Sequence, residues 1–438
     1  MSVEQRLYEW IGGIQYDRLP PAVRERAAVI WMHDLVLGRR FGHGFWPGQV
    51  LQDGLQTKAP DQGWLLLGQT KRSYSAEESV QFNSTSMASS VLEDFYGGLH
   101  LGPVIIPVVM HELEKSDGLA DSKAWEKAVE AVVAGFETGI WLQDRFGELL
   151  GQMGLRATPL IGALAAVGAI AKMRGLSEAE YRAALSLPAS IGLGAGFSLL
   201  GGTEEWIYQA GLSARLAYQS VRFTRGMRYP NASSLTGSHS LRKLLKDGHV
   251  AGHMGDALQN NRYRILDVGL KRHPVNIFVQ PAVEAMSRTV REIGKDAVRG
   301  ATEIEIQVAE QVSNMKLLQH PGPFEQPYQS VLSIPACVAM AGIHGSFLFA
   351  DLRQINQFEI QKTARKVNIT GSRELSAYDA RLTMKSKGQV VHQAGVQSDF
   401  FYPPLDRERQ WLETKGWNIT GDDELWISPI LKLLTAGR

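Results

Sequence analysis

Apolar residues recur at helical spacing through most of the first 260 residues. Residues 19–38 (LPPAVRERAAVIWMHDLVLG) begin beside two prolines, which favour a helix start, and we expect the helix to stop at Gly38. Residues 158–175 (TPLIGALAAVGAIAKMRG) predict a second helix, with Thr158 as its N-cap and Gly175 as its C-terminal stop. The inner face of the first helix is expected to carry Val23, Ala27, Ile30 and Val36.

The pattern changes near residue 262. Residues 301–310 (ATEIEIQVAE) alternate polar and apolar positions, as a half-buried strand does. The alternation returns at 364–370 and at 379–395, where Lys387 and Gly388 predict a hairpin turn. Helical patterns occupy 281–293 and 329–342 and return after residue 404. We therefore expect a mainly α protein: a large all-helical domain over 1–262, completed by a C-terminal helical tail over 396–438, with a smaller α+β lid domain inserted over 263–395.

Charge and apolar runs exclude several classes of partner. The chain has 438 residues, with 46 Lys and Arg against 45 Asp and Glu, so neither nucleic acid nor an anionic membrane is expected to attract it. The longest apolar run, residues 160–171, is shorter than a membrane span, and the charged N-terminus is unlike a signal peptide. We expect a cytoplasmic protein. Cys337 is the single cysteine and lies in an apolar run, which predicts a buried thiol.

Three motifs with well-known chemistry are incomplete. The glycine-rich segment 190–202 (SIGLGAGFSLLGG) lacks both the spacing and the preceding strand of a dinucleotide loop, so close helix packing is the better interpretation. His249 and His253 are four residues apart but have glycines between them and no nearby acidic ligand. A serine nucleophile elbow does not occur. We expect no metal and no cofactor.

Two segments concentrate groups able to do chemistry. Residues 89–108 (SSVLEDFYGGLHLGPVIIPV) place Glu93, Asp94 and His100 before an apolar run. Residues 266–286 (LDVGLKRHPVNIFVQPAVEAM) place Lys271, Arg272 and His273 before a proline at the expected domain boundary. Three cationic or titratable groups at such a boundary would suit a carboxylate substrate. A solvated turn is the alternative for the second segment.

Four segments, in this order, resemble the MmgE/PrpD family, which includes 2-methylcitrate dehydratase, cis-aconitate decarboxylase and iminodisuccinate epimerase. They are residues 19–38 with Asp34, 82–108, 154–176 and 270–286. The resemblance implies a helical domain with an α+β lid and a homodimer. It also implies proton abstraction beside a carboxylate of a small di- or tricarboxylate, with neither a metal nor an organic cofactor.

The resemblance also assigns individual positions. With Asn83 on the family's asparagine, Glu93 and Asp94 fall on its paired acids, His100 on its loop histidine and Lys271 on its lysine. Other positions depart from the family. Val91 replaces an acid, Phe95 a threonine, Arg156 a histidine, Tyr208 a histidine and Gln280 a later histidine, while Glu205 stands near the place of a lysine. Val91 and Phe95 suggest a bulkier or less charged substrate.

Proton abstraction needs a base and positive groups where enolate charge grows. His100 is the expected base, with Asp94 and Lys271 as further catalytic residues; Glu93 or Asp94 would orient His100 or act as the acid. The expected substrate-binding residues are Glu93, Arg156, Tyr208, Arg272, His273 and Gln280. Two alternatives stay open: an epimerase of an amino- or imino-dicarboxylate, and a non-catalytic relative that serves as a binding subunit.

Overall fold

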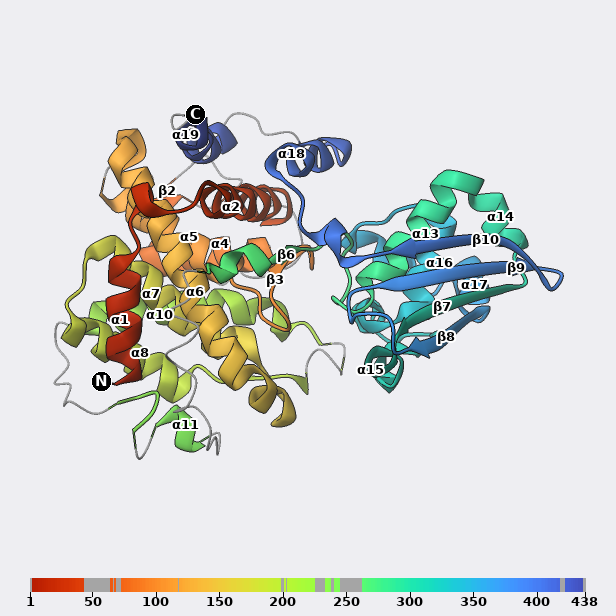
Figure 1. Cartoon of the computed structure of the whole chain (residues 1–438), viewed down its shortest axis with the longest axis horizontal. Coiled ribbons are helices and arrows are strands. Elements are labelled where there is room, and N and C mark those ends of the chain that lie inside the picture. Colours follow the sequence, from red (N-terminus) through yellow and green to blue (C-terminus); the bar gives the residue numbers. More distant parts are fainter. Residues whose placement is uncertain are drawn as a thin grey trace.

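The computed structural model describes residues 2–42, 64–65, 67, 72–116, 118–197, 201, 203–224, 233–237, 240–244, 262–417 and 422–435. His249 and His253 lie outside these residues, as does part of the glycine-rich segment. A helical body and a smaller lobe built around a sheet lie side by side along the long axis (Figure 1). The expectation of a mainly α fold is confirmed. No described helix combines the length and apolarity needed to cross a membrane.

Long helices surround one hydrophobic core in the helical body. The most buried is α5 (Gly102–Lys115), whose residues from Gly102 to Glu114 are all buried and which packs against α4, α6, α7 and α10. Valine, isoleucine and proline dominate its sequence, so it is apolar on every side, as a central helix must be. The other helices of the body are α1 (Val3–Gly13), α2 (Pro21–Gly42), α4 (Ala76–Ala88), α6 (Ser122–Gln152), α7 (Ala163–Arg174), α8 (Glu178–Ile191), α10 (Glu205–Phe223) and α11 (Leu241–Leu244).

The smaller lobe, called the lid below after the expected domain, is built around a four-stranded sheet in the order β10-β9-β7-β8. Its action as a lid stays a prediction. Its strands are β7 (Glu303–Ala309), β8 (Val367–Ser372), β9 (Ala380–Ser386) and β10 (Gln389–Val396). The β7–β8 pair is parallel, and the other pairs are antiparallel. Helices α13 (Gln280–Ile293) and α16 (Ile334–His344) pack on the sheet and share a second hydrophobic core with Ile304 and Leu382. Shorter lid helices are α14 (Lys295–Gly300), α15 (Glu310–Ser313) and α17 (Phe358–Ala364).

The C-terminal tail returns to the helical body. Helices α18 (Leu405–Thr414) and α19 (Asp422–Thr435) lie against α2, and Leu412, Trp426 and Ile427 belong to the core of the body (Figure 1). The described residues thus form two large hydrophobic cores, one in the body with its tail and one in the lid, and a small cluster of Phe95, Ile277 and Phe401. The domain boundaries at 262 and 396 stay a prediction.

The structure confirms the predicted hairpin turn, one of the two predicted helix stops and the buried cysteine. The hairpin is confirmed: Lys387 and Gly388 join β9 to β10 with φ values of 50° and 80°. Gly175 ends α7 with φ 63°, and Cys337 is buried, both as expected. The stop at Gly38 is wrong, because α2 continues to Gly42. A Cβ at Gly38 would lie 2.7 Å from Leu67 and 2.8 Å from Met87, so this glycine permits close packing.

Candidate active site

Two very short strands join the two polar segments. Strand β3 (Asp94–Phe95) pairs antiparallel with β6 (Gly269–Leu270), with Asp94 opposite Leu270 and Phe95 opposite Gly269. Gly269 has to be a glycine here, since a Cβ would lie 2.5 Å from the Phe95 ring. The ladder places Glu93, just before β3, beside Lys271, just after β6. The strands therefore bring together the two segments singled out from the sequence.

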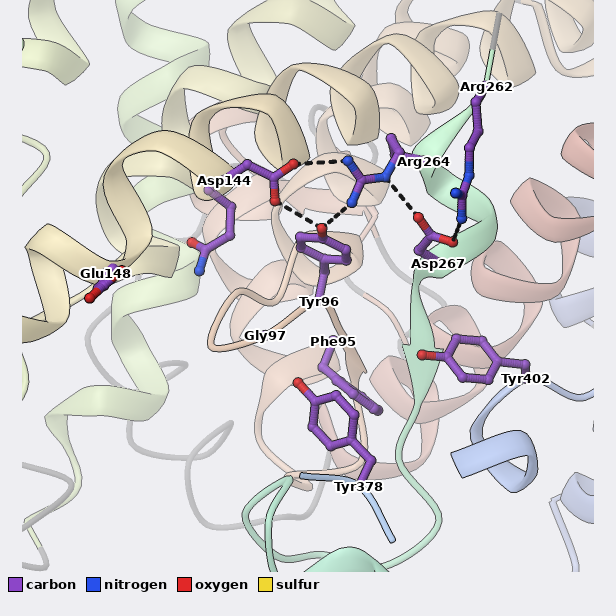
Figure 2. Close-up of a pocket in the computed structure, with 11 residues that line it drawn as sticks. Phe95, Tyr96, Gly97, Asp144, Glu148, Arg262, Arg264, Asp267, Tyr378 and Tyr402 are labelled. Atoms are coloured by element: carbon purple, nitrogen blue, oxygen red, sulfur yellow. Dashed lines mark hydrogen bonds and ion pairs between the residues drawn. The ribbon is translucent and has the colours of Figure 1, made fainter. Parts of the chain in front are cut away.

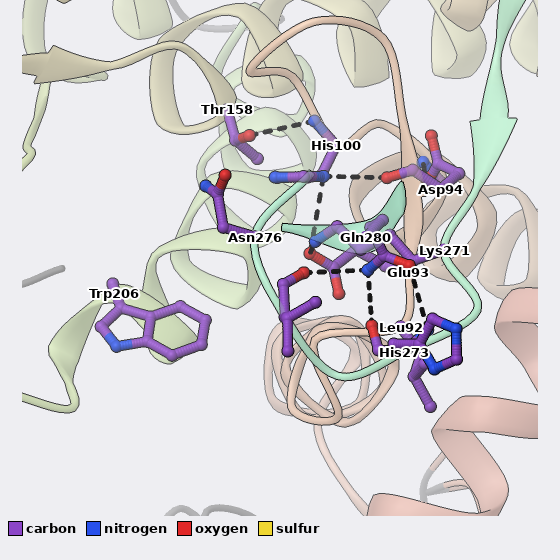
Figure 3. A network of polar contacts seen from close by, with 12 residues as sticks. Leu92, Glu93, Asp94, His100, Thr158, Trp206, Lys271, His273, Asn276 and Gln280 are labelled. Carbon is purple, nitrogen blue, oxygen red and sulfur yellow. Dashed lines mark hydrogen bonds and ion pairs between the residues drawn. The ribbon is translucent and has the colours of Figure 1, made fainter. Parts of the chain in front are cut away.

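Glu93 and Lys271 form a buried ion pair. Lys271 Nζ donates to Glu93 Oε1 at 2.6 Å, and the two side chains are 4% (Glu93) and 3% (Lys271) exposed (Figure 3). Burial opposes ionisation of Glu93, but the Lys271 ammonium and His100 hold the pKa of this carboxyl below its ordinary value. The pair is therefore charged at neutral pH. It supplies a fixed cation in a region shielded from water.

His100 has a defined tautomer. Its Nδ1 lies 2.8 Å from the backbone oxygen of Asp94, which can only accept, so Nδ1 carries a proton. Glu93 Oε1 lies 3.5 Å from the same nitrogen. Burial and the charge of Lys271 lower the pKa of His100 to about 3, so the ring is neutral and Nε2 keeps its lone pair. Figure 3 shows the ring directed to the side on which Asn276 and Trp206 are drawn.

Arg156 supplies a second cation near His100, and its side chain is half-buried. It is held by β4 (Leu155–Arg156), which pairs with β5 (Gly194–Ala195). Its Nη1 donates to the Trp206 backbone oxygen at 2.8 Å and to Gln209 Oε1 at 2.7 Å. Burial lowers the pKa of Arg156 to about 10, which still leaves it charged at neutral pH, and its charge acts on His100. His100 thus lies within the field of two cations.

Thr158 does not cap the helix that follows it, so this expectation is wrong. It is the first residue of a π-helical segment, Thr158–Gly162, that leads into α7. Its hydroxyl accepts from the His100 backbone N–H at 3.1 Å. The Thr158 hydroxyl therefore holds the loop that carries His100. It does not cap the start of the helix to which Thr158 belongs.

Asp94 holds the start of α5 and shares its environment with Asp34. Its two carboxyl oxygens accept from the backbone N–H groups of Leu101, at 3.2 Å, and Gly102, at 2.7 Å. Burial raises the pKa of Asp94 to about 6, although these two N–H groups oppose the rise. Asp34 on α2 is fully buried, and burial together with the charges of Asp94 and Glu93 raises its pKa well above the ordinary value. Both Asp34 carboxyl oxygens are buried without a hydrogen-bond partner among the described residues, so this carboxyl lies next to Asp94 in an environment that disfavours its charged form.

Arg272, His273 and Gln280 contact the scaffold. Gln280 Oε1 accepts from the backbone N–H groups of Arg272 and His273, each at 3.0 Å, and its Nε2 donates to the His273 oxygen at 2.5 Å. His273 Nε2 lies 3.0 Å from Glu284 Oε2, and burial lowers the pKa of His273. These contacts are those of residues that shape the Lys271 loop. A substrate-binding role for them stays a prediction.

The positions on α10 are more peripheral. Tyr208 is half-buried, and burial raises the pKa of its hydroxyl to about 12. Glu205 is exposed at the first residue of the helix. Trp206 between them is buried and makes the backbone contact to Arg156. Substrate binding by Tyr208 stays a prediction.

Val91 and Phe95 occupy distinct environments. Val91 has φ 58°, a strained value for a β-branched residue, and it packs into the lid core with Trp206 and Val275. The Phe95 ring meets Phe401 edge-on, with centroids 4.8 Å apart, at the junction of lid and body. A strained backbone residue thus lies two positions before Glu93. The Phe95 ring packs between the body and the lid.

Phe95 also lines a cavity of about 610 Å³ that is distinct from the surroundings of His100. Its polar wall is a network in which Arg264 contacts Asp144 at 2.9 Å and Asp267 at 2.7 Å, and Tyr96 donates to Asp144 at 2.8 Å (Figure 2). Cations and carboxylates therefore neutralise one another in this cavity. Within the described part of the chain, no three His, Cys, Asp or Glu side chains are grouped as a metal site requires.

Several buried polar residues were not selected from the sequence as site residues. Asp34 entered only as the end of a family-like helix segment, although His33 and Asp34 are two polar residues within an otherwise apolar stretch, which is a usable signal. Glu408 and Trp411 of α18 gave no signal, because charged residues surround them in LDRERQWLETKG. Asn276, drawn beside His100, lies within the segment 266–286 singled out above, but it was not selected there.

Comparison with known proteins identifies the family. The model of the MmgE/PrpD N-terminal domain matches residues 5–227, just over half of the 438 residues. Among curated proteins, the cis-aconitate decarboxylase-like protein oryM of Aspergillus oryzae is 24% identical over 196 residues. That match covers 42% of this chain and 39% of the relative, so the chain spans about two fifths of the length of this curated protein. Because the domain match covers half of the sequence, the chain belongs to the MmgE/PrpD family.

Proposed function

We propose that this protein is a lyase or isomerase that removes a proton beside a carboxylate of a small carboxylic acid, without a cofactor. The observation that carries the proposal is the state of His100. Its Nδ1 proton is committed to the Asp94 backbone oxygen, and its Nε2 lone pair is free to accept a proton. Lys271 is buried and Arg156 half-buried, and the charges of both reach this ring, as does that of Glu93. A neutral base with two cations nearby suits the chemistry of a carboxylate.

The steps follow from these groups. A substrate carboxylate binds against Lys271 and Arg156. His100 Nε2 takes the proton from the adjacent carbon, and the electron pair of the broken C–H bond moves into the carboxylate as an enediolate. The two cations stabilise the added negative charge more than they stabilise the ground state. Collapse of the enediolate then expels a leaving group from the next carbon, or the proton returns to the opposite face.

Dehydratase- or decarboxylase-like chemistry is the form that the family and the named relative support best. In a decarboxylation, the C–C bond to the carboxylate breaks, CO2 leaves, and the electron pair left on carbon takes a proton. His100 would deliver that proton only after it had itself been protonated at Nε2, because Nδ1–H is bound to Asp94. The geometry therefore favours reactions that begin with proton removal. A homodimer and a cytoplasmic location are part of the proposal.

Deuterium exchange tests the proposal whichever product is formed. The protein is incubated in D2O with cis-aconitate, 2-methylcitrate and aspartate-type acids, and NMR follows deuterium entry beside the carboxylate. We expect exchange in the wild type and its loss in His100→Gln, while the control His320→Gln, an exposed lid histidine, behaves as the wild type. New alkene signals, CO2 release and inverted configuration distinguish dehydration, decarboxylation and epimerisation. Full exchange in His100→Gln would refute the role of His100, and wild-type binding without exchange would favour the non-catalytic alternative.

A further inference from the structure

A buried charge cluster links the C-terminal tail to α2. Glu408 of α18 is fully buried, and its Oε1 lies 2.7 Å from His33 Nδ1. The other ring nitrogen of His33, Nε2, lies 2.8 Å from the Leu92 backbone oxygen. Both partners are acceptors, so both contacts are hydrogen bonds only when the His33 ring carries two protons. His33 is therefore held between the tail and the segment that leads to Glu93.

The second oxygen of Glu408 faces Arg272. Arg272 Nη1 lies 2.6 Å from Glu408 Oε2, and this contact is an ion pair without the alignment of a hydrogen bond. Burial opposes ionisation of Glu408, but Arg272 and His33 bring the pKa of this carboxyl down to about 2. Trp411, one turn further along α18, contacts both partners of Glu408: its ring centroid lies 4.7 Å from the Arg272 guanidinium carbon and is stacked at 5.8 Å on the His33 ring.

Both arms of the cluster end beside the Glu93–Lys271 pair. His33 binds the backbone oxygen of Leu92, the residue immediately before Glu93, and Arg272 immediately follows Lys271. A single carboxylate thus holds the two chain segments whose next residues form the ion pair. Those segments are otherwise joined by the two-residue β3–β6 ladder, which by itself is a weak tie.

We propose that Glu408 of α18 is a positioning residue, which acts through His33 and Arg272 to set the Glu93–Lys271 pair and thereby the cation that faces the substrate. This inference rests on the proposed function. A merely structural account predicts only that α18 docks on the body. Burying the Glu408–Arg272 ion pair is a costly way to dock a helix that already offers Leu412 to the core, whereas holding two chain segments in place requires one group that contacts both.

The test compares two truncations on the same helix. Glu408→Ala removes the positioning carboxylate, and the control Leu412→Ala removes a buried side chain of α18 that belongs to the hydrophobic core of the body. We expect kcat to fall about 10- to 100-fold in Glu408→Ala, because a shift of the order of 1 Å in a reacting group has that effect. Leu412→Ala should lower the unfolding temperature and leave kcat, measured well below unfolding, within about twofold of the wild type. Glu408→Gln keeps the side-chain shape and one acceptor oxygen, so its kcat should lie between those of Glu408→Ala and Leu412→Ala. If Glu408→Ala does not fold, Glu408→Gln replaces it in the comparison.

Citrate binding by calorimetry separates this inference from the proposed function. If the wild type binds citrate but turns over no acid, the lyase proposal fails. The positioning role of Glu408 is then tested by citrate affinity, which should weaken in Glu408→Gln and stay unchanged in Leu412→Ala. The inference is overturned if the Glu408 variants keep wild-type kcat and citrate affinity, or if Leu412→Ala loses as much of both. If the wild type neither binds citrate nor exchanges deuterium into any of the acids tested, the carboxylate site itself is overturned and both proposals with it.

Discussion

Removing Lys271 should destabilise the protein more than loss of a surface charge would. The Lys271→Met substitution deletes the ammonium and keeps most of the side-chain volume, so Glu93 is left as a buried carboxylate. At the 2.6 Å separation of the pair, the Coulomb attraction is about 6 kcal/mol with an effective dielectric constant of about 20. Desolvation of the two ions offsets much of that attraction, and breaking a buried pair typically costs about 3–5 kcal/mol. We expect a loss within this range at neutral pH.

The pH dependence of this loss has a definite sign. In the wild type, Lys271 and His100 outweigh burial and keep the pKa of Glu93 below its ordinary value of 4.5. The contribution of Glu93 to stability is therefore complete above pH 4.5 and is lost as the pH falls through the lowered pKa. Without the ammonium, burial raises the pKa of Glu93 above 4.5. The resulting penalty is present at high pH and is relieved as pH falls. The stability gap between Lys271→Met and the wild type should therefore be smaller at about pH 5 than at about pH 8.

A double-mutant cycle isolates the pair. The free energy of unfolding in urea is measured for the wild type, Lys271→Met, Glu93→Leu and the double variant. The double variant removes both charges, so it should recover much of the stability that each single variant loses, with a coupling energy of about 2–3 kcal/mol. A coupling energy below about 0.5 kcal/mol, or a gap that does not change with pH, would show that the pair is solvated and would refute the reasoning.

Three further predictions concern other residues. Gly102→Ala should lower the free energy of unfolding by about 1–3 kcal/mol in urea, because its Cβ would overlap Asp34 and lie 2.6 Å from Asp94, whereas Gly98→Ala, with open space around it, should be nearly neutral. Arg156→Lys should raise KM for the carboxylate substrate several-fold in steady-state kinetics, because Arg156 uses Nη1 for Trp206 and Gln209 and keeps other guanidinium nitrogens for a carboxylate, whereas Lys has a single nitrogen; an unchanged KM would contradict its binding role. Cys337 should react with a thiol reagent only at the rate of unfolding, since burial raises the pKa of its thiol; rapid labelling of the native protein would contradict this.

Much of the fold was predictable because it rests on local patterns. The alternation in β7 and β9 and the Lys387-Gly388 turn placed the sheet, and the apolar runs placed the body helices. Failures arose where a residue acts through tertiary contacts. Gly38 has the sequence signature of a helix stop, but the surfaces of Leu67 and Met87, far along the chain, make it a packing glycine. A glycine that ends a helix and a glycine that permits close packing inside a helix look the same in the sequence.

The candidate site was predictable in its chemistry and less so in its geometry. The sequence marks Glu93, His100 and Lys271 as a group, yet the ladder that joins them has two residues per strand, too few to produce a pattern. Neighbouring side chains in a strand point to opposite faces, and so Phe95 lies at the junction while Asp94 turns to α5. The positioning carboxylate comes from a helix more than 300 residues away from Leu92, a separation that local patterns do not encode.

The return of the tail to the helical body has a consequence for synthesis on the ribosome. The Tyr16 hydroxyl donates to the Leu433 backbone oxygen, a contact between positions 417 residues apart. The entire lid sequence therefore leaves the ribosome before the body can be completed. During that interval the lid has time to fold first. The surface of α2 that later contacts α18 and α19 is meanwhile exposed, and the nascent body therefore depends on protection from aggregation.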